Sequence, residues 1–208
     1  MGQRYHDDQR ALQDRFETRR LADRLDEATA EVIGDAHRRF IERQDLFFLA
    51  TADADGVPQC SSKGGAPGFV RVLDDRTIAF PLYDGNGMFL SAGNMAANPH
   101  VALLFIDLTD GTRLRFNGVA ELVDEGPLLD AYPGALLVVR VLGEAVFANC
   151  RRYVPTRASS TPSQFVPDGA SPPPVPDWKR DAWFDGTLPA GDPALDPDRP
   201  SAPSIPRF

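Results

Sequence analysis

Two hydroxyls, a lysine and two glycines follow one another where an apolar run ends, in the stretch Ser61-Ser62-Lys63-Gly64-Gly65. Hydroxyl and ammonium groups donate hydrogen bonds, and glycine lets an anion approach the backbone closely because it has no Cβ. The stretch matches neither GxxxxGK[ST] nor GxGxxG, and alone such a sequence is more often a solvated turn. A plain turn and an anion site both stay open on these residues.

The turn Gly85-Asn86-Gly87 is a second candidate, because it opens the predicted helix GMFLSAGNMAANP. The first N–H groups of a helix have no intrahelical acceptor, and the positive end of the helix dipole lies beside them. The same glycines would serve a tight turn without any ligand. The residues by themselves leave both interpretations standing.

Composition limits the classes of partner. The net charge is −8 and the pI about 4.8, so the surface repels phosphate backbones and we do not expect nucleic acid. No apolar run approaches the roughly 18 residues of a membrane span, and the charged N-terminus lacks a signal core. Cys60 and Cys150 are the only cysteines, which fits the reducing cytoplasm. The histidines share no ligand-like spacing, so no metal site is expected.

The elements that must position these residues follow from apolar spacing. Residues 9–28 have apolar positions at helical intervals, and residues 32–44 predict a second helix. The period then changes to that of strands, and a short helix ends before Pro99. The predicted strands cover 46–53, 57–63, 68–74, 77–84, 101–108, 112–123 and 135–149.

Seven strands with short connections predict a mainly β (α+β) fold, a closed or partly closed barrel rather than a doubly wound sheet. We expect the continuous apolar strand 101–108 to be buried on both faces. We expect a bulge at Gly118, where the alternation of the strand 112–123 changes.

The C-terminal part differs in composition, since 13 of the 19 prolines lie in residues 155–208. A disordered tail is one interpretation, but Trp178 and Trp183 argue for an arm anchored on the body or on a partner subunit. The predicted division is therefore helices in 1–45, a barrel domain in 46–154, and a Pro-rich arm in 155–208 that is partly extended or mobile.

The order of motifs from Phe40 to Val123 resembles the pyridoxamine 5'-phosphate oxidase-like family of FMN-binding split barrels. The resembling stretches are FLATADADGVPQCSSKGG, PGFVRVLDDRTIAFP, GNGMFLSAGN, NPHVALLFID and LRFNGVAEL, and the match extends through LLVVRVLGEAVFANCRRYV. Within the family, the chain is most similar to the branch that carries KGG.PGFVR and NGMF.S.GN. The resemblance implies a homodimer with flanking helices and with FMN in clefts between the subunits.

By the resemblance, the strand edge and the helix start would bind the flavin, and two later segments would complete the site. The residues it implicates are Ser61, Ser62, Lys63, Asn86, Gly87, Met88, Ser91, Asn94, Arg113, Arg115, Arg151 and Trp178. Gly87 and Gly93 stand where many relatives have basic residues, so phosphate binding would depend more on Lys63, on backbone N–H groups and on the arginines. The arginine- and tryptophan-bearing end of the oxidases themselves is not found, which argues against pyridoxamine phosphate oxidation.

No Ser-His-Asp, Cys-His or paired-carboxylate arrangement can be assembled, which is consistent with a cofactor that carries the chemistry. The leading hypothesis is an FMN-dependent oxidoreductase that passes electrons between a reduced nicotinamide and a small acceptor. A non-catalytic flavin-binding or stress-associated protein is the first alternative. A reductase that uses deazaflavin F420 on the same fold is the second.

Overall fold

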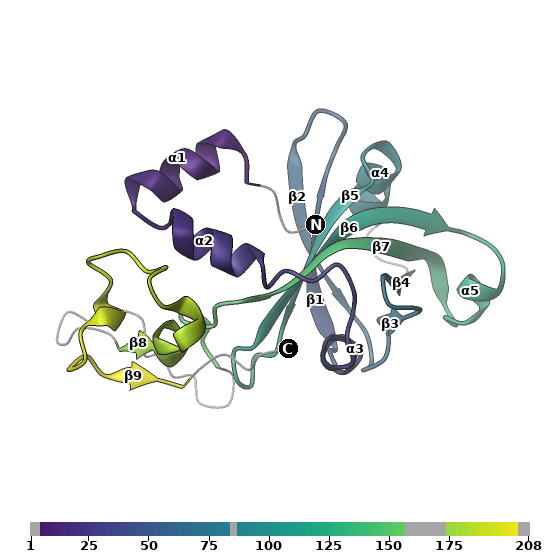
Figure 1. Cartoon of the computed structure of the whole chain (residues 1–208). Coiled ribbons are helices and arrows are strands. Elements are labelled where there is room, and N and C mark those ends of the chain that lie inside the picture. The colour runs from purple at the N-terminus through teal and green to yellow at the C-terminus, as the bar shows by residue number, and fades with distance from the viewer. Residues whose placement is uncertain (1–4, 84–86, 157–173, 204–208) are drawn as a thin grey trace. The chain divides into compact units, whose positions relative to one another are not determined.

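The computed structural model describes residues 5–83, 87–156 and 174–203 (Figure 1). These residues form two compact units. The barrel unit comprises residues 30–106 and 113–148, and the terminal unit comprises the described residues of 1–29, 107–112 and 149–207.

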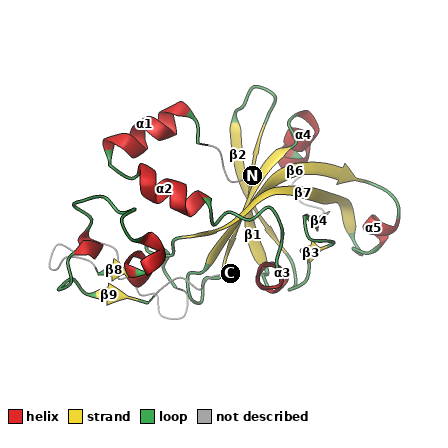
Figure 2. Cartoon of the chain, viewed as in Figure 1, coloured by secondary structure: helices red, strands yellow, loops and turns green. Residues whose placement is uncertain are grey.

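The barrel unit is built on one seven-stranded, mostly antiparallel sheet, which confirms the seven predicted strands, although the third is only two residues long (Figure 2). The strands are β1 (Leu46–Ala52), β2 (Pro58–Gly64), β3 (Arg71–Val72), β4 (Thr77–Tyr83), β5 (His100–Ile106), β6 (Arg113–Val123) and β7 (Ala135–Asn149). Their order in the sheet is β2-β1-β5-β6-β7-β4-β3. The strands β2 and β3 are therefore its two edges.

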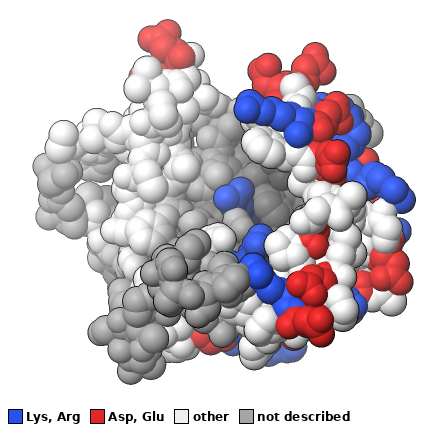
Figure 3. Space-filling model, turned by 90° about the vertical axis from the view of Figure 1, so that its left-hand side faces the viewer, with Lys and Arg blue, Asp and Glu red and all other residues white. Residues whose placement is uncertain are grey.

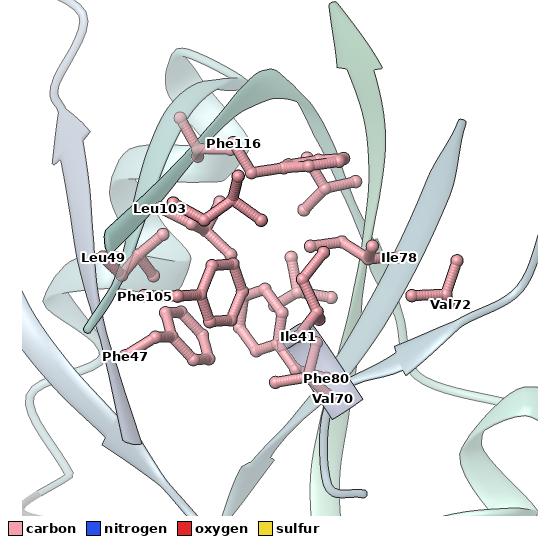
Figure 4. Packing of buried hydrophobic residues seen from close by; sticks show 14 of the residues in the cluster. Ile41, Phe47, Leu49, Val70, Val72, Ile78, Phe80, Leu103, Phe105 and Phe116 are labelled. Atoms are coloured by element: carbon pink, nitrogen blue, oxygen red, sulfur yellow. The ribbon is translucent and has the colours of Figure 1, made fainter. Parts of the chain in front are cut away.

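The sheet curls on itself around an aromatic core. The rings of Phe47 on β1 and Phe80 on β4 have centroids 4.9 Å apart, although β5, β6 and β7 lie between these strands in the sheet. Phe105 on β5 packs on the same ring of Phe47 at 5.2 Å (Figure 4). Contact between distant strands requires a curved sheet whose one face encloses the core, which is the geometry of a barrel.

Three helices belong to the barrel unit, namely α3 (Asp35–Glu42), α4 (Leu90–Ala97) and α5 (Pro127–Asp130). The helix α3 lies against β3, because the guanidinium of Arg38 donates to the carbonyl of Val72 at 2.7 Å. The helix α4 contacts β1, β2 and β6, and Pro99 follows its end as predicted. The residues of α5 pack with Tyr132 on the outer side of the sheet, against Ala79 and Val138.

The outer face of β5 corrects one expectation. Val101, Leu103 and Phe105 are buried, whereas Ala102 and Leu104, on the opposite face, are only partly buried. The strand 101–108 is therefore not buried on both faces within this chain. Its apolar outer residues join the exposed Phe48 of β1, which lies opposite Leu104 in the register.

Gly118 corrects a second expectation, because β6 pairs with β5 through Gly118 without a shift in register. A Cβ at Gly118 would lie 2.2 Å from the carbonyl oxygen of Leu142 on β7. The glycine is thus required by a close approach of two backbones, and its pairing with β5 contains no bulge.

The terminal unit contains two helices where the sequence predicts one over 9–28. The helices are α1 (Asp7–Arg15) and α2 (Arg19–Asp26). The chain turns between them at Glu17, whose φ of 55° is left-handed. The charged, continuous helical pattern across this turn contains no glycine or proline, so the sequence did not signal the break.

The described part of the C-terminal arm is folded onto itself and onto α2. It contains the short strands β8 (Val175–Pro176) and β9 (Ser201–Ala202) and the single-turn helices η1 (Asp177–Arg180), η2 (Ala182–Phe184) and η3 (Pro193–Leu195). Trp178 and Trp183 both pack on Phe184, with ring centroids 4.8 and 4.7 Å away. The guanidinium of Arg24 on α2 stacks on Trp183 at 5.1 Å and so fixes the arm.

No helix among the described residues is both long enough and apolar enough to cross a lipid bilayer.

Candidate functional site

Two hydroxyls and the ammonium of Lys63 converge at the edge of the barrel. The Oγ of Ser91 on α4 lies 3.1 Å from the Oγ of Ser61 and 3.3 Å from the Nζ of Lys63, both on β2. Ser61, Lys63 and Ser91 are each partly buried. We call these three residues the anion cluster, because a lysine and two hydroxyls together offer several donors and a positive charge.

Strand register explains why Ser61 and Lys63 face α4. Residues paired across antiparallel strands point to the same face of the sheet. Lys63 is paired with the buried Phe47, and Ser61 with the buried Leu49. Because β2 is an edge strand, these two polar side chains emerge at the rim of the core, where α4 lies beside β1 and β2.

The start of α4 adds further donors. Phe89, the residue before the helix, makes no side-chain cap hydrogen bond, and the first turn of α4 contains no acidic residue. The N–H groups of this turn are then available to an anion, and the helix dipole favours one there. Phe89 itself has a left-handed φ of 49°, an uncommon conformation for an aromatic residue.

Lys63 carries its charge in an environment that does not compensate it. Partial burial lowers the pKa of its ammonium below the usual value of 10.5. Among the residues that the structure describes, the hydroxyl of Ser91 is its hydrogen-bond partner and no carboxylate lies within ion-pair distance. An anionic ligand would supply the missing countercharge.

Asn94 lies one turn after Ser91 but has a different partner. Its Nδ2 donates to the Oγ1 of the buried Thr51 at 3.1 Å. Asn98, at the end of α4, donates to the carbonyl oxygen of Asp53 at 3.4 Å. These two amides attach α4 to β1 and so hold Ser91 in position.

Ser62, Arg113 and Arg115 lie on the outer face of the sheet, opposite to the anion cluster. Across the neighbouring strands β2, β1, β5 and β6, the register pairs Ser62 with Phe48, Phe48 with Leu104, and Leu104 with Arg115. Paired residues point to the same face of the sheet. The guanidinium of Arg115 lies over the ring of Phe147 on β7 at 5.8 Å. The structure therefore separates the candidate residues into two groups on two faces.

The remaining candidates belong to neither group. Gly87 has a left-handed φ of 72° with open space around it, and Met88 is exposed. Asn86 lies outside the described residues. Arg151 and Trp178 belong to the terminal unit, where Arg151 donates to the carbonyl oxygen of Pro203 at 3.0 Å.

Sequence reasoning missed two residues that shape the barrel, one beside α4 and one beside α5. In the sequence, Thr51 is one residue of an apolar strand and does not stand out. It lies two residues after Leu49 and four after Phe47, so the two-residue period of a strand places its side chain on the same inward face. Tyr132 follows α5, is buried, and donates from its hydroxyl to the carbonyl oxygen of Ala79 at 3.0 Å. Nothing in the sequence near Tyr132 signals this contact.

Arg71 completes the surroundings of Tyr132. Its guanidinium stacks on the ring of Tyr132 at 4.4 Å and donates to the carbonyl oxygen of Ala131 at 2.8 Å. Burial raises the pKa of Tyr132 to about 12. Arg71 is thus attached to Tyr132 and to the residue before it.

The surface charges are of mixed sign. Figure 3 shows Lys and Arg side chains next to Asp and Glu side chains among the described residues of the face that it draws. The described residues contain no group of three or more histidine, cysteine, aspartate or glutamate side chains able to hold a metal ion.

Several solved structures are similar to this chain. HupZ of Group A Streptococcus is 25% identical with a TM-score of 0.47, and the alignment covers 56% of this chain and 93% of HupZ. HutZ, a heme storage protein of Vibrio cholerae, is 19% identical with a TM-score of 0.41, and the alignment covers 56% of this chain and 94% of HutZ. General Stress Protein 26 of Bacillus anthracis is 12% identical with a TM-score of 0.41, and the alignment covers 53% of this chain and 88% of that protein.

No curated protein matches the chain. The TM-scores of the three structures lie below 0.5, so the family assignment depends on the sequence. Residues 33–166, more than half of the chain, match the family model described as pyridoxamine 5'-phosphate oxidase. Together with the seven-stranded barrel, this match shows that the chain belongs to the pyridoxamine 5'-phosphate oxidase family of split barrels.

Proposed function

We propose that the protein is an FMN-dependent oxidoreductase that passes electrons between a reduced nicotinamide and a small acceptor. The observation that supports it most is the anion cluster, in which Lys63 and Ser61 of one strand meet Ser91 at the start of a helix. Membership of this family makes a flavin mononucleotide the first candidate for the anion. The cytoplasm is the proposed location, in keeping with the two free cysteines.

The donor set fits a phosphate monoester. A phosphate offers several strong acceptor oxygens and, at neutral pH, close to two negative charges. The cluster offers one ammonium, two hydroxyls and the N–H groups of the first turn of α4, with no acidic residue in that turn to repel the ligand. A Cβ at Gly87, three residues before α4, would meet nothing within 4 Å, so the approach to the start of the helix is open there.

When bound, FMN would supply hydride and electron transfer, which no side chain of the barrel provides. The protein would contribute binding and orientation. Lys63 would neutralise the phosphate, Ser61 and Ser91 would donate hydrogen bonds to it, and Asn94 would keep α4 attached to Thr51 on β1. The absence of a carboxylate beside Lys63, among the described residues, leaves its charge available for this role.

We further propose that two copies pair through the outer face of β1, β5 and β6. Phe48, Ala50, Ala102 and Leu104 make this face apolar, yet they are exposed or only partly buried in the single chain. On the outer face of β4 and β7, by contrast, Tyr132 covers Ala79. Pairing would bring Arg115, on the same face, into the contact between the copies.

The absorption spectrum of the purified protein tests the cofactor. We expect flavin bands, release of FMN on denaturation, and bleaching by NADH or NADPH without oxygen, followed by recovery when an acceptor is added. Bands without bleaching would leave a flavin-binding protein and contradict the enzyme. A mass spectrum that shows deazaflavin F420 or haem, or protein that stays colourless with added FMN, would contradict FMN.

Sedimentation tests the pairing separately, with the variant Leu104→Glu. A carboxylate on this face would be desolvated in the contact, so we expect the variant to sediment as a smaller species than the parent. Glu144→Gln, which changes a charge on an exposed side chain of β7, serves as the control. A parent chain that is monomeric at micromolar concentration would contradict the pairing.

A further inference from the structure

The helix α1 has an unusual orientation in the terminal unit, because its polar side chains make the contacts and its apolar side chains face solvent. Arg10 forms an ion pair with Asp23 of α2 at 2.6 Å, and Tyr5, just before α1, donates from its hydroxyl to the carbonyl oxygen of Ala22 at 3.2 Å. Leu12 and Phe16 are 54% and 61% exposed, and no residue of α1 is buried. A surface helix normally has the opposite arrangement.

The exposed side chains share one face of α1. Residues spaced three or four apart lie on the same side of a helix of 3.6 residues per turn. This spacing groups the exposed side chains of Asp8, Leu12, Arg15 and Phe16 on one side of α1. The charges on this face are arranged along the helix, with Asp8 in the first turn and Arg15 in the last. Leu12 thus lies between one negative and one positive end, and Phe16 follows directly after the positive end.

This face is complementary to itself when two copies are antiparallel. In that arrangement Leu12 lies opposite Leu12 of the second copy, and Asp8 lies near Arg15 of the second copy at both ends of the contact. Both charges are available for it. Among the described residues Arg15 has no carboxylate partner and stacks on the neighbouring ring of Phe16 at 5.4 Å, and the basic group beside Asp8 is the exposed His6 at 4.0 Å.

We propose that α1 forms an antiparallel contact with α1 of a second copy of this chain. The helix lies outside residues 33–166, which match the family, so the contact belongs to this chain rather than to the shared barrel. Two helices of nine residues bury less surface than the roughly 1,200–2,000 Å² of a stable interface. The contact therefore does not produce association alone, and it rests on the pairing proposed above, which it would strengthen.

Charge exchange tests the proposal in the full chain. Asp8→Arg alone and Arg15→Glu alone place like charges opposite each other, and each is expected to weaken association by about tenfold, measured by sedimentation over a range of concentrations. The double variant Asp8→Arg/Arg15→Glu restores opposite charges and should recover most of the loss. Circular dichroism checks that α1 stays helical, since the exchanged charges oppose the helix dipole.

Disulfide formation tests the geometry directly, in a chain with Cys60→Ser and Cys150→Ser. Leu12→Cys lies at the centre of the contact and should form a covalent dimer on mild oxidation. Asp7→Cys is exposed but lies on another side of α1, so it should form far less. Equal cross-linking at both positions, or equal association of the two single charge variants and the parent, would overturn the proposal. Because the residues proposed to bind FMN lie outside α1, the flavin spectrum should be unchanged in every variant.

Discussion

The ammonium of Lys63 and the hydroxyl of Ser91 lie 3.3 Å apart, although 28 positions separate them in the chain. The contact joins an edge strand of the barrel to the start of a helix, so it combines a side-chain charge with free backbone donors.

Replacing Lys63 by alanine should weaken FMN binding by roughly ten- to a hundredfold, as measured by fluorescence titration. The variant loses one charge-assisted hydrogen bond, worth about 1.5–3 kcal/mol. The affinity of the parent should fall with added salt, and that of the variant less steeply. Arg140→Ala removes the same charge from β7, where Arg140 pairs with Glu121, and should bind FMN like the parent. Unchanged affinity in Lys63→Ala would show that this stretch is only a turn.

Replacing Lys63 by methionine should leave the ligand-free protein at least as stable as the parent. Burial lowers the pKa of Lys63, so the unfolded chain binds this proton more tightly than the folded one. The charged lysine therefore costs stability at neutral pH, and the cost disappears as the pH rises above the unfolded value near 10.5. Urea unfolding at pH 7 and at pH 10.5 measures the difference, which should shrink at the higher pH. A variant that is clearly less stable at pH 7 would refute this account.

Gly118→Ala and Gly93→Ala should change the free energy of unfolding in opposite directions. A Cβ at Gly118 would lie 2.2 Å from a backbone oxygen of β7, so we expect a loss of at least about 2 kcal/mol. A Cβ at Gly93 meets nothing within 4 Å and lies inside α4, so we expect a gain of about 0.5–1 kcal/mol. Chemical denaturation of both variants measures the two changes. A Gly118→Ala variant as stable as the parent would contradict the close approach of the Leu142 carbonyl to Gly118.

Tyr132→Phe should alter stability most at alkaline pH. The pKa of Tyr132 is raised to about 12 in the fold, so between pH 10 and pH 12 ionisation favours the unfolded chain. The parent should therefore lose stability progressively as the pH rises from 10 toward 12, by roughly 2–3 kcal/mol in total. The variant lacks this component, and below pH 10 it should be about 1 kcal/mol less stable because the bond to Ala79 is lost. Parallel losses in both proteins above pH 10 would contradict the assignment.

The sequence by itself determined the strands, because alternation and turn chemistry are local. Asp53 accepts hydrogen bonds from the N–H groups of Asp55 and Val57, and the turn it begins is where the sequence predicts one. The sequence also identified Lys63 as a candidate, since its type suits an anion, and the resemblance to the family added Ser91. It could not show that they touch, because that depends on β2 lying at the edge of the sheet beside α4.

Tertiary structure also decided which side each candidate faces. Ser62 and Lys63 are neighbours in the chain, yet pairing with Phe48 and Phe47 sends them to opposite faces, so only one joins the cluster. Gly118 looked like a bulge because a strand pattern cannot report that the carbonyl of Leu142 approaches it from another strand. The break at Glu17 gave no local signal either, since the charged helical pattern continues through it. Local preference fixes the elements, while contacts between distant segments fix the register, the faces and the site.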